Sequence, residues 1–518
     1  MMLLTTILKE NIEKFGEHDF IRFGDSTYTN IELDHLSTKL ANYLQTKVKS
    51  QSDKVIVYLQ NCPEVLVAYQ AILKAGAVVV PVMYALNANE VHYIMENSDA
   101  DTIITSSSLY DNIVTVAQKM DKKIHVIVTD AFENGHVERN MEVHELNQIY
   151  FSSEDKLIEN NLNVKEDDLA VILYTSGTTS QPKGVMLTHR NLYISAQASA
   201  NVMEVEMLRK TTVVALPLAH SFGFTAMNMY LNLGSTVIVL ERFDAEEIFK
   251  AVEKYKIQSF SAVPAMIYGM IMHPSIDNYD FSSVVGILCS SAPLPIALSE
   301  AFTRKTGVPI WQGYGLSEAA PVVSLQWRDM VQKTRSVGPP IDIVEAKVID
   351  EDGNTLPTGE IGELAVKGLN VTPGYYRLEE ETARTIVDGW LRTGDIAYMD
   401  EDDYIFIVDR KKDMVIRGGL NIFPRDIEEV IVMHSDVLEV AAVGVPDEQM
   451  GECLVAYVVK KPDASITAEE IIAFSQEHLA KYKTPKEVIF IDQLPRNGVG
   501  KILKRGLVDI YQKEVTNR

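Results

Sequence analysis

The stretch from Lys54 to Val82, K-V-I-V-Y-L-Q-N-C-P-E-V-L-V-A-Y-Q-A-I-L-K-A-G-A-V-V-V-P-V, decides the fold class of this chain. The apolar run at 54–59 predicts a strand. The segment from Pro63 predicts a helix that ends near Gly76, because proline suits the first turn of a helix and glycine follows its end. A second apolar run at 77–82 predicts another strand. A strand, a helix and a strand of these lengths indicate a parallel sheet with helices outside it.

The alternation of strand and helix patterns continues on both sides of this stretch. Apolar spacing predicts a helix over 30–48 and another over 88–97, and D-T-I-I-T at 101–105 predicts a strand. The alternation of strands and helices then repeats, with expected strands at 212–217, 235–240 and 257–264 and expected helices at 223–232 and 244–255. The first part of the chain is therefore expected to be of the α/β class.

The composition and the apolar pattern of the sequence change after about Gln332. Residues 337–408 hold many glycines, aspartates and short alternating runs, which predict a compact β subdomain with hairpins. Beyond a charged segment at 409–413, a small α/β domain is expected, with helices at 425–434 and 467–480 and strands at 438–445 and 453–460. We place the domain boundary within 409–413.

Composition limits the function classes. The chain has 518 residues and a formal net charge of −24, which opposes binding to nucleic acids or anionic lipid surfaces. Its three cysteines are widely spaced and form no C-x-x-C pair, which fits a reducing cytosol rather than a disulfide framework. The first residues lack a basic segment, and no run reaches the roughly 18 apolar residues of a membrane helix. We expect a cytoplasmic protein and leave a peripheral membrane contact open.

A loop rich in hydroxyls and glycine follows one of the apolar runs. It reads L-Y-T-S-G-T-T-S-Q-P-K-G-V-M-L from Leu173 to Leu187. Small residues let backbone amides approach a phosphate closely, hydroxyls add donors, and Lys183 supplies a positive charge. The loop lacks the Walker spacing G-x-x-x-x-G-K-[ST]. By composition alone it is a linker more often than not, but its shortness, the strand before it and the P-K-G after it favour a phosphate-binding loop.

This loop resembles the signature loop of the adenylate-forming enzymes, the superfamily of acyl-CoA synthetases, peptide-synthetase adenylation domains and firefly luciferase. Seven further segments resemble the other motifs of that superfamily in its order, over nearly the whole chain: L-P-L-A-H-S-F-G (216–223), S-S-A-P-L-P (290–295), Q-G-Y-G-L-S-E (312–318), R-T-G-D (392–395), D-R-K-K-D (409–413), R-G-G-L-N-I-F-P (417–424) and P-R-N-G-V-G-K (495–501). Y-Y-R-L-E-E-E-T and D-G-W-L-R-T-G-D look most like bacterial medium- and long-chain fatty acyl-CoA synthetases.

The resemblance implies an architecture and a reaction. The fold it implies is a large N-terminal domain (1–410), with two stacked α/β sheet subdomains plus a β subdomain, and a small mobile C-terminal α+β domain (411–518). The reaction would use ATP and Mg²⁺ to convert a carboxylic acid, here a fatty acid, into acyl-AMP and pyrophosphate, and would then transfer the acyl group to the thiol of CoA. Positioning and electrostatic stabilisation would do most of the catalysis.

The resemblance also assigns residues to the nucleotide and metal sites. Glu318 and the hydroxyl of Thr175 would be hard oxygen ligands of Mg²⁺, although a lone glutamate is more often a solvated surface residue. Asp395 would accept the ribose hydroxyls and Tyr314 would stack on adenine. The S-S-A-P segment departs from a family that often has glycine there. The full ATP/AMP set is Thr175, Ser176, Gly177, Thr178, Thr179, Lys183, Ser291, Ala292, Pro293, Gly313, Tyr314, Gly315, Leu316, Ser317, Asp395, Ile407, Arg410 and Lys501.

Lys501 is the residue most expected to act in adenylation. The glycine-rich segment before it suits a mobile loop that brings a cation between the carboxylate and the α-phosphate. The family usually has threonine where Val499 stands. The family's domain rotation would hinge at Lys412, a position where a solvated charge is almost as good an interpretation. Gly418, Gly419 and Leu420 would then help to form the CoA tunnel.

The acyl group is expected in an apolar pocket. His220 would line and gate it, although a single histidine in an apolar stretch is more often structural. Amino-acid-activating relatives place an aspartate near here, and A-H-S-F-G-F has no acid to pair with a substrate ammonium. The pocket set is His220, Phe222, Gly223, Met227, Val263, Met266, Gly315 and Ala319, and the catalytic set is Lys501, Glu318, His220 and Thr175.

Two rival functions remain open. One is a ligase that loads an acyl or aryl group onto the phosphopantetheine of a carrier protein, which the lack of an obvious insertion between 335 and 409 disfavours. The other is a non-enzymatic acyl-binding homologue, which the joint presence of Lys183, Glu318, Asp395, Arg410 and Lys501 disfavours. Chain length, aryl or alkyl preference and homodimer formation are left open by the sequence.

Overall fold

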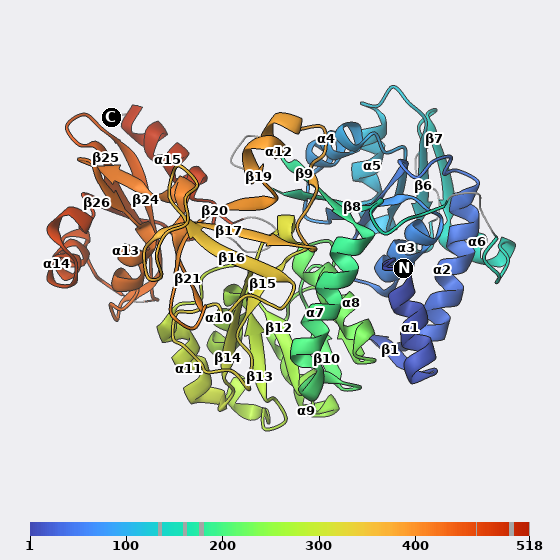
Figure 1. The fold of residues 1–518 in the computed structure, drawn as a ribbon, viewed down its shortest axis with the longest axis horizontal. Helices are drawn as coiled ribbons and strands as arrows, with labels where there is room; N and C mark the ends of the chain where they lie inside the picture. Colours follow the sequence, from blue (N-terminus) through green and yellow to red (C-terminus); the bar gives the residue numbers. More distant parts are fainter. Residues whose placement is uncertain (133–136, 159–162, 176–180, 463, 497–501, 517–518) are drawn as a thin grey trace. The chain divides into compact units, whose positions relative to one another are not determined.

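The computed structural model describes residues 1–132, 137–158, 163–175, 181–462, 464–496 and 502–516 (Figure 1). The chain forms two compact units. The first comprises Met1–Leu294, Leu298–Ala346 and Val366–Leu391, and the second comprises Pro295–Ala297, Lys347–Ala365 and Arg392–Arg518.

The largest sheet of the first unit has eight strands in the order β18-β9-β8-β4-β3-β5-β6-β7. The neighbours from β8 to β7 are parallel, and β9 and β18 join antiparallel at one edge. The strands are β3 (Lys54–Leu59), β4 (Val78–Met83), β5 (Thr102–Thr105), β6 (Ile124–Val128), β7 (Met141–Glu145), β8 (Leu169–Thr175), β9 (Lys183–Thr188) and β18 (Gly374–Tyr375). A parallel sheet buried on both faces needs near-continuous apolar strands, which explains the V-I-V-Y-L and V-V-V-P-V runs.

Two four-stranded sheets also lie in this unit. Their orders are β10-β11-β1-β2 and β12-β13-β14-β15. The bounds are β1 (Asp19–Phe23), β2 (Ser26–Thr29), β10 (Thr211–Val214), β11 (Thr236–Val239), β12 (Ser259–Ala262), β13 (Gly286–Cys289), β14 (Ile310–Gly315) and β15 (Val322–Leu325). Strand β1 pairs parallel with β11 although some 200 residues separate them.

Helices pack against these strands and against one another. Figure 1 shows α7 and α8 side by side, and they pack on each other as do α2 and α3. Capping boxes start α2 at Thr29, α4 at Asn87 and α7 at Thr188. The helices are α1 (Thr6–Phe15), α2 (Asn30–Gln45), α3 (Pro63–Lys74), α4 (Ala88–Ser98), α5 (Tyr110–Ala117), α6 (Leu146–Ser152), α7 (His189–Met207), α8 (Ser221–Asn232), α9 (Ala245–Tyr255), α10 (Pro264–Met272), α11 (Ile296–Thr306) and α12 (Glu379–Thr385).

A further sheet is ordered β16-β17-β20-β19, with β21 paired to β20. Its strands are β16 (Val344–Ile349), β17 (Gly362–Gly368), β19 (Ile386–Val387), β20 (Trp390–Met399) and β21 (Ile405–Arg410). It occupies the region in which the sequence predicted a β subdomain with hairpins, and β20 and β21 form such an antiparallel pair.

The C-terminal part of the second unit contains a five-stranded sheet ordered β23-β22-β25-β24, with β26 paired to β25. Apolar side chains of this sheet and its helices form two clusters, one around Val415 and Ile427 and one around Tyr457 and Leu507. The elements are β22 (Val415–Arg417), β23 (Leu420–Ile422), α13 (Pro424–Ile431), β24 (Val437–Asp447), β25 (Gly451–Lys460), α14 (Ala468–His478), β26 (Glu487–Phe490) and α15 (Lys504–Thr516).

The predicted α/β class is confirmed, and the predicted strands and helices are found within a few residues of their expected ends. The expectation of parallel strands needs two additions. Periodicity did not indicate the β1–β2 hairpin, nor the antiparallel addition of β9 and β18 to the large sheet. Across the described ranges, no helix combines the length and apolarity needed to cross a membrane.

Candidate active site

The hydroxyl-rich loop joins two antiparallel strands. Thr175, the last residue of β8, lies opposite Lys183, the first residue of β9. Directly opposed residues of an antiparallel pair point to the same face of the sheet. The hairpin therefore places the hydroxyl of Thr175 and the ammonium of Lys183 on one face at the base of the loop. The predicted phosphate-binding residues Ser176, Gly177, Thr178 and Thr179 lie outside the described residues.

Lys183 is held by two residues from a segment almost 200 positions further along the chain. Its ammonium forms an ion pair with Glu381 of α12 and lies 5.5 Å from the ring centroid of Tyr375. The hydrogen bond from Lys183 holds the pKa of the Glu381 carboxyl below its ordinary value. Arg384, three residues after Glu381 on the same helix, also forms an ion pair with Glu381 at 2.9 Å. Lys183 thus has an anionic partner within its own unit.

Glu318 meets the same tyrosine. It lies in a 3₁₀ turn, Ser317–Ala319, that follows β14. The hydroxyl of Tyr375 donates to Oε1 of Glu318 at 2.9 Å, and the amide of Thr372 donates to the Glu318 carbonyl at 2.8 Å. Tyr375 therefore lies between the loop lysine and the predicted metal ligand. In the sequence, Y-Y-R-L-E-E-E-T carries a family likeness, but nothing in it singles out Tyr375. Only its place beside β9 reveals it.

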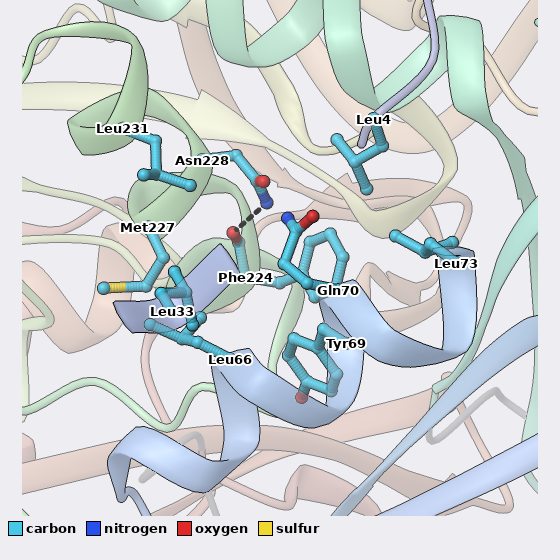
Figure 2. A pocket seen from close by; sticks show the side chains of 10 residues that line it. All are labelled: Leu4, Leu33, Leu66, Tyr69, Gln70, Leu73, Phe224, Met227, Asn228 and Leu231. Carbon is cyan, nitrogen blue, oxygen red and sulfur yellow. Dashed lines mark hydrogen bonds between the residues drawn. The ribbon is translucent and has the colours of Figure 1, made fainter. Parts of the chain in front are cut away.

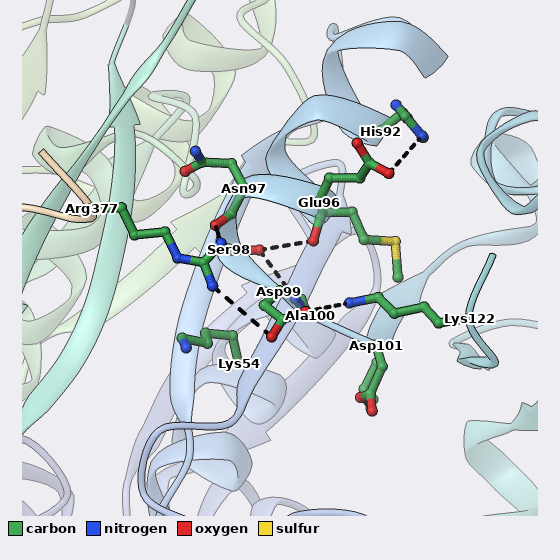
Figure 3. A network of polar contacts seen from close by, with 12 residues as sticks. Lys54, His92, Glu96, Asn97, Ser98, Asp99, Ala100, Asp101, Lys122 and Arg377 are labelled. Carbon is green, nitrogen blue, oxygen red and sulfur yellow. Dashed lines mark hydrogen bonds and ion pairs between the residues drawn. The ribbon is translucent and has the colours of Figure 1, made fainter. Parts of the chain in front are cut away.

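The residues after Tyr375 contact β3 and the C-terminal end of α4. Lys54 of β3 donates to the hydroxyl of Tyr376 at 2.9 Å, and Arg377 donates to the carbonyl of Asn97 at 3.0 Å. Figure 3 shows Arg377 and Lys122 converging on Asp99, which follows α4. Arg377 thereby ties the segment that follows β18 to the C-terminal end of α4.

Three of the predicted ligand-binding positions follow parallel strands of one sheet. Val263 comes directly after β12, Ser291 follows β13, and Tyr314 lies at the end of β14. The carboxyl ends of parallel strands share one edge, where α/β proteins usually bind ligands. Ser291 has φ 75°, in the left-handed region that favours glycine. The serine therefore keeps a backbone conformation that glycine would adopt without strain. Ala292 and Pro293 follow it in the segment that leads to α11.

Glycines near β14 are explained by packing in the protein itself. A Cβ on Gly315 would lie 2.0 Å from the carbonyl oxygen of Pro321, and a Cβ on Gly313 would lie 2.6 Å from Leu325. Gly315 therefore needs glycine whether or not a ligand is bound, because it meets backbone, whereas a side chain at Gly313 would require the end of the Leu325 side chain to shift. Leu316 precedes the 3₁₀ turn, and Ser317 within the turn donates to the hydroxyl of Ser221 at 3.3 Å.

His220 caps helix α8. Its Nδ1 accepts a hydrogen bond from the amide of Phe222 at 3.3 Å, which satisfies one of the first free amides of the helix. Gly223 packs tightly as well, because a Cβ there would lie 2.2 Å from the carbonyl oxygen of Pro217. The Ser317–Ser221 contact brings the start of α8 next to the turn that carries Glu318 and the buried Ala319. A structural role for His220 is therefore present, and its gating role stays a prediction.

Met227 lines a small pocket among the first helices. Figure 2 shows its side chain beside residues of α2 and α3, and neither Val263 nor Met266 contributes to this lining. Met227 thus lines a pocket to which Val263 and Met266, two other residues of the predicted acyl pocket, do not contribute. The lining residues are Leu4, Leu33, Leu66, Tyr69, Gln70, Leu73, Phe224, Met227, Asn228 and Leu231.

The second unit holds the predicted ribose-binding residues. Asp395 of β20 lies opposite Arg410 of β21, and Nε of Arg410 donates to Oδ1 of Asp395 at 3.0 Å. Asp395 is buried, with 4% of its surface exposed. Ile407 lies on the same strand as Arg410. The structure therefore brings Asp395 and Arg410 into contact and places Ile407 on the same strand as Arg410.

The remaining predicted residues also lie in the second unit. Lys412 is the middle residue of a 3₁₀ turn, Lys411–Asp413. Gly418 and Gly419 form the tight turn between β22 and β23 with φ 59° and 82°, and Leu420 begins β23. Both glycines therefore adopt a conformation that other residues rarely take. Lys501 lies outside the described residues, so its expected role in adenylation stays a prediction.

The residues of the first unit suit a magnesium ion shared with a nucleotide. Among the described residues, no group of three or more His, Cys, Asp or Glu side chains could hold a metal alone. Mg²⁺ is usually bound through one or two protein carboxylates together with substrate phosphates and water. Glu318 offers a carboxylate and Thr175 a hydroxyl, both hard oxygen donors of the kind that Mg²⁺ prefers. Their role as ligands of Mg²⁺ stays a prediction.

Comparison with known proteins gives one consistent family. The model described as AMP-binding enzyme matches residues 8–376, and the model described as AMP-binding enzyme C-terminal domain matches residues 426–501. A long-chain-fatty-acid–CoA ligase of Bacillus subtilis (strain 168) is 35% identical over 527 residues, covering 98% of this chain and 94% of the relative. A feruloyl-CoA synthase of Amycolatopsis sp is 33% identical, covering 93% and 94%.

Solved structures agree with these relatives. ATP-bound MatB from Rhodopseudomonas palustris superimposes with a TM-score of 0.88 at 29% identity, covering 98% of this chain and 99% of that one. The o-succinylbenzoate CoA synthetase MenE from Bacillus subtilis, in complex with its acyl-adenylate intermediate, superimposes with a TM-score of 0.82 at 28% identity and 97% coverage of both.

Proposed function

Because the chain belongs to the family of AMP-binding enzymes, we propose that it is a fatty acid–CoA ligase that consumes ATP. The observation that carries this proposal is the full-length match to a long-chain-fatty-acid–CoA ligase at 35% identity. The absence of an acidic residue in A-H-S-F-G-F supports a substrate without an ammonium group.

In the first step, an oxygen of the fatty acid carboxylate attacks the α-phosphorus of ATP, and the bond to pyrophosphate breaks. Both reactants are anions, so the chain has to bring cationic groups to them. Lys183 at the base of the loop is the described residue best suited to bind the phosphates. Lys501 would bridge the carboxylate and the α-phosphate. When bound, Mg²⁺ would neutralise phosphate charge, and Glu318 and Thr175 would hold it.

In the second step, the sulfur of CoA attacks the acyl carbonyl, AMP leaves, and the thiol proton is released. Asp395 and Arg410 would bind the ribose, and the Gly418–Gly419 turn would let the pantetheine approach the backbone. Groups from the large and the small domain serve different steps, so we propose a rotation about Lys412 between them, with the domains at 1–410 and 411–518.

The test is AMP release from a panel of acids of different chain lengths, plus aryl acids, with CoA or a phosphopantetheinylated carrier protein as the acceptor. We expect turnover with CoA and a long-chain acid. Because a relative is a feruloyl-CoA synthase, an aryl optimum is the second candidate outcome. Acyl-AMP that is discharged only onto the carrier protein would reject the CoA ligase.

A matched pair, Lys501→Ala and Lys513→Ala, checks the adenylation lysine, since only the first should abolish ATP–pyrophosphate exchange.

A further inference from the structure

Tyr375 contacts both Glu318 and Lys183 in the first unit. Its hydroxyl donates to Oε1 of Glu318 at 2.9 Å, and its ring centroid lies 5.5 Å from the ammonium of Lys183. A cation within about 6 Å of an aromatic face is attracted by the ring. Tyr375 itself is buried, with 8% of its surface exposed.

We propose that Tyr375 is a positioning residue for the adenylation reaction: its hydroxyl fixes the Glu318 carboxylate and its ring fixes the Lys183 ammonium. The inference rests on the proposed function, because it assigns Tyr375 a task toward the residues that would bind Mg²⁺ and the nucleotide.

The hydroxyl fixes the carboxylate in one orientation. It engages Oε1 of Glu318, while Oε2 takes no hydrogen bond from any described residue. Tyr375 thus orients the carboxylate with one oxygen held by the protein and one oxygen left for a ligand.

The backbone of Tyr375 is itself immobilised. Strand β18 pairs with β9 so that Tyr375 lies opposite Val185, two residues after Lys183. The amide of Tyr375 donates to Oγ1 of Thr382 at 2.9 Å, and the next amide, that of Tyr376, donates to the carbonyl of Gly184 at 2.8 Å. A side chain that projects from such a backbone can hold its partners in a fixed geometry, which a positioning residue requires.

The expected size follows from residues that orient metal ligands elsewhere. Removing such a residue typically costs about 10- to 100-fold in metal affinity or activity. We expect Tyr375→Phe to lose affinity toward the low end of that range, because the carboxylate remains. Tyr375→Phe keeps the ring and therefore the contact with Lys183. Tyr375→Leu removes both contacts and should also weaken nucleotide binding that does not depend on the metal.

The experiment measures binding of a non-hydrolysable ATP analogue to the full chain by calorimetry, with and without Mg²⁺, for the wild type, Tyr375→Phe, Tyr375→Leu and the control Tyr376→Phe. Tyr376 is the matched control because it is the adjacent phenol and its hydroxyl contacts Lys54 instead of the site. The Mg²⁺ dependence of ATP–pyrophosphate exchange is measured for the same proteins. High Mg²⁺ concentrations should restore exchange in Tyr375→Phe.

The expected result is a loss of the Mg²⁺-dependent part of the affinity in Tyr375→Phe, with metal-free binding, melting temperature and Tyr376→Phe unchanged. Unaltered Mg²⁺-dependent binding in Tyr375→Phe would reject the positioning role, as would an equal loss with and without Mg²⁺. If Tyr375→Leu does not fold, Tyr375→Phe alone decides. A wild type that binds no ATP analogue would overturn the proposed function and this inference with it, whereas a binding wild type and an unaffected Tyr375→Phe would reject only the inference.

Discussion

Lowering the pH from 7 to 5 should destabilise this protein chiefly through one buried histidine, His189. This residue begins α7, and 3% of its surface is exposed. Its Nδ1 accepts a hydrogen bond from the amide of Leu4 at 3.3 Å, which ties the N-terminal segment to α7. Burial lowers the pKa of His189 from 6.5 to about 4. The folded protein therefore binds a proton at His189 less readily than the unfolded chain does.

The sign and the magnitude follow from this difference. The contribution of His189 is fully present above the unfolded pKa of 6.5 and is lost as the pH falls toward the folded value of about 4. Between pH 7 and pH 5 the loss in the free energy of unfolding amounts to about 2 kcal/mol. Part of the acid sensitivity comes from other groups, such as His125, whose pKa is also lowered, mainly by burial.

The assay is urea unfolding followed by tryptophan fluorescence at both pH values. All three tryptophans, Trp311, Trp327 and Trp390, lie in the unit that contains His189, so the signal reports the unfolding of that unit. His189→Asn keeps a side-chain acceptor for the Leu4 amide but does not titrate. The pH-dependent loss should therefore be about 2 kcal/mol smaller in His189→Asn than in the wild type.

Exposed His35 provides the matched control, and His35→Asn should show the wild-type dependence on pH. Contributions from other titrating groups are common to the wild type and both variants, so they cancel in the comparison. If His189→Asn loses as much stability as the wild type between pH 7 and pH 5, His189 does not titrate as a buried neutral group and the reasoning is refuted.

Three further predictions concern the turn after Glu318, the β22–β23 turn and the turn after β13. Asn370 is fully buried and its amide donates to the carbonyls of Ala319 and Val322 at 2.7 and 2.8 Å. Asn370→Ala should lower the free energy of unfolding by about 2 kcal/mol and Asn370→Asp by more, because carboxylate oxygens would face both carbonyls; a milder effect of Asp than of Ala in urea unfolding would contradict this. Gly418→Ala, at φ 59°, should lower the free energy of unfolding by about 1 kcal/mol. If the turn serves CoA, the substitution should also slow thioester formation while leaving pyrophosphate exchange intact. Single-turnover assays can separate these two steps. Ser291→Gly should relieve a left-handed conformation at φ 75° and leave the melting temperature equal or higher, whereas a clear fall would show that the serine side chain stabilises the turn.

The sequence by itself determined many of the helices and strands and the family, and it indicated a function for the loop. Periodicity predicted the strands at 54–59 and 101–105, because buried parallel strands need continuous apolar residues, and it predicted the helix from Pro63, because proline and glycine mark helix ends. The hydroxyl-rich composition around Lys183 indicated a phosphate loop, and the order of the motifs indicated the family, which the comparisons confirm.

Tertiary structure alone decided which distant residues meet. The pairing of β1 with β11 and of β18 with β9 depends on register and packing between segments far apart in the chain, which local periodicity does not encode. For this reason Tyr375 could be read in the sequence only as one of two adjacent tyrosines, whereas in the fold it touches Glu318 and Lys183 while Tyr376 faces Lys54. Successive residues of a strand point to opposite faces, so the pairing of two residues of β18 with β9 decided which tyrosine belongs to the site.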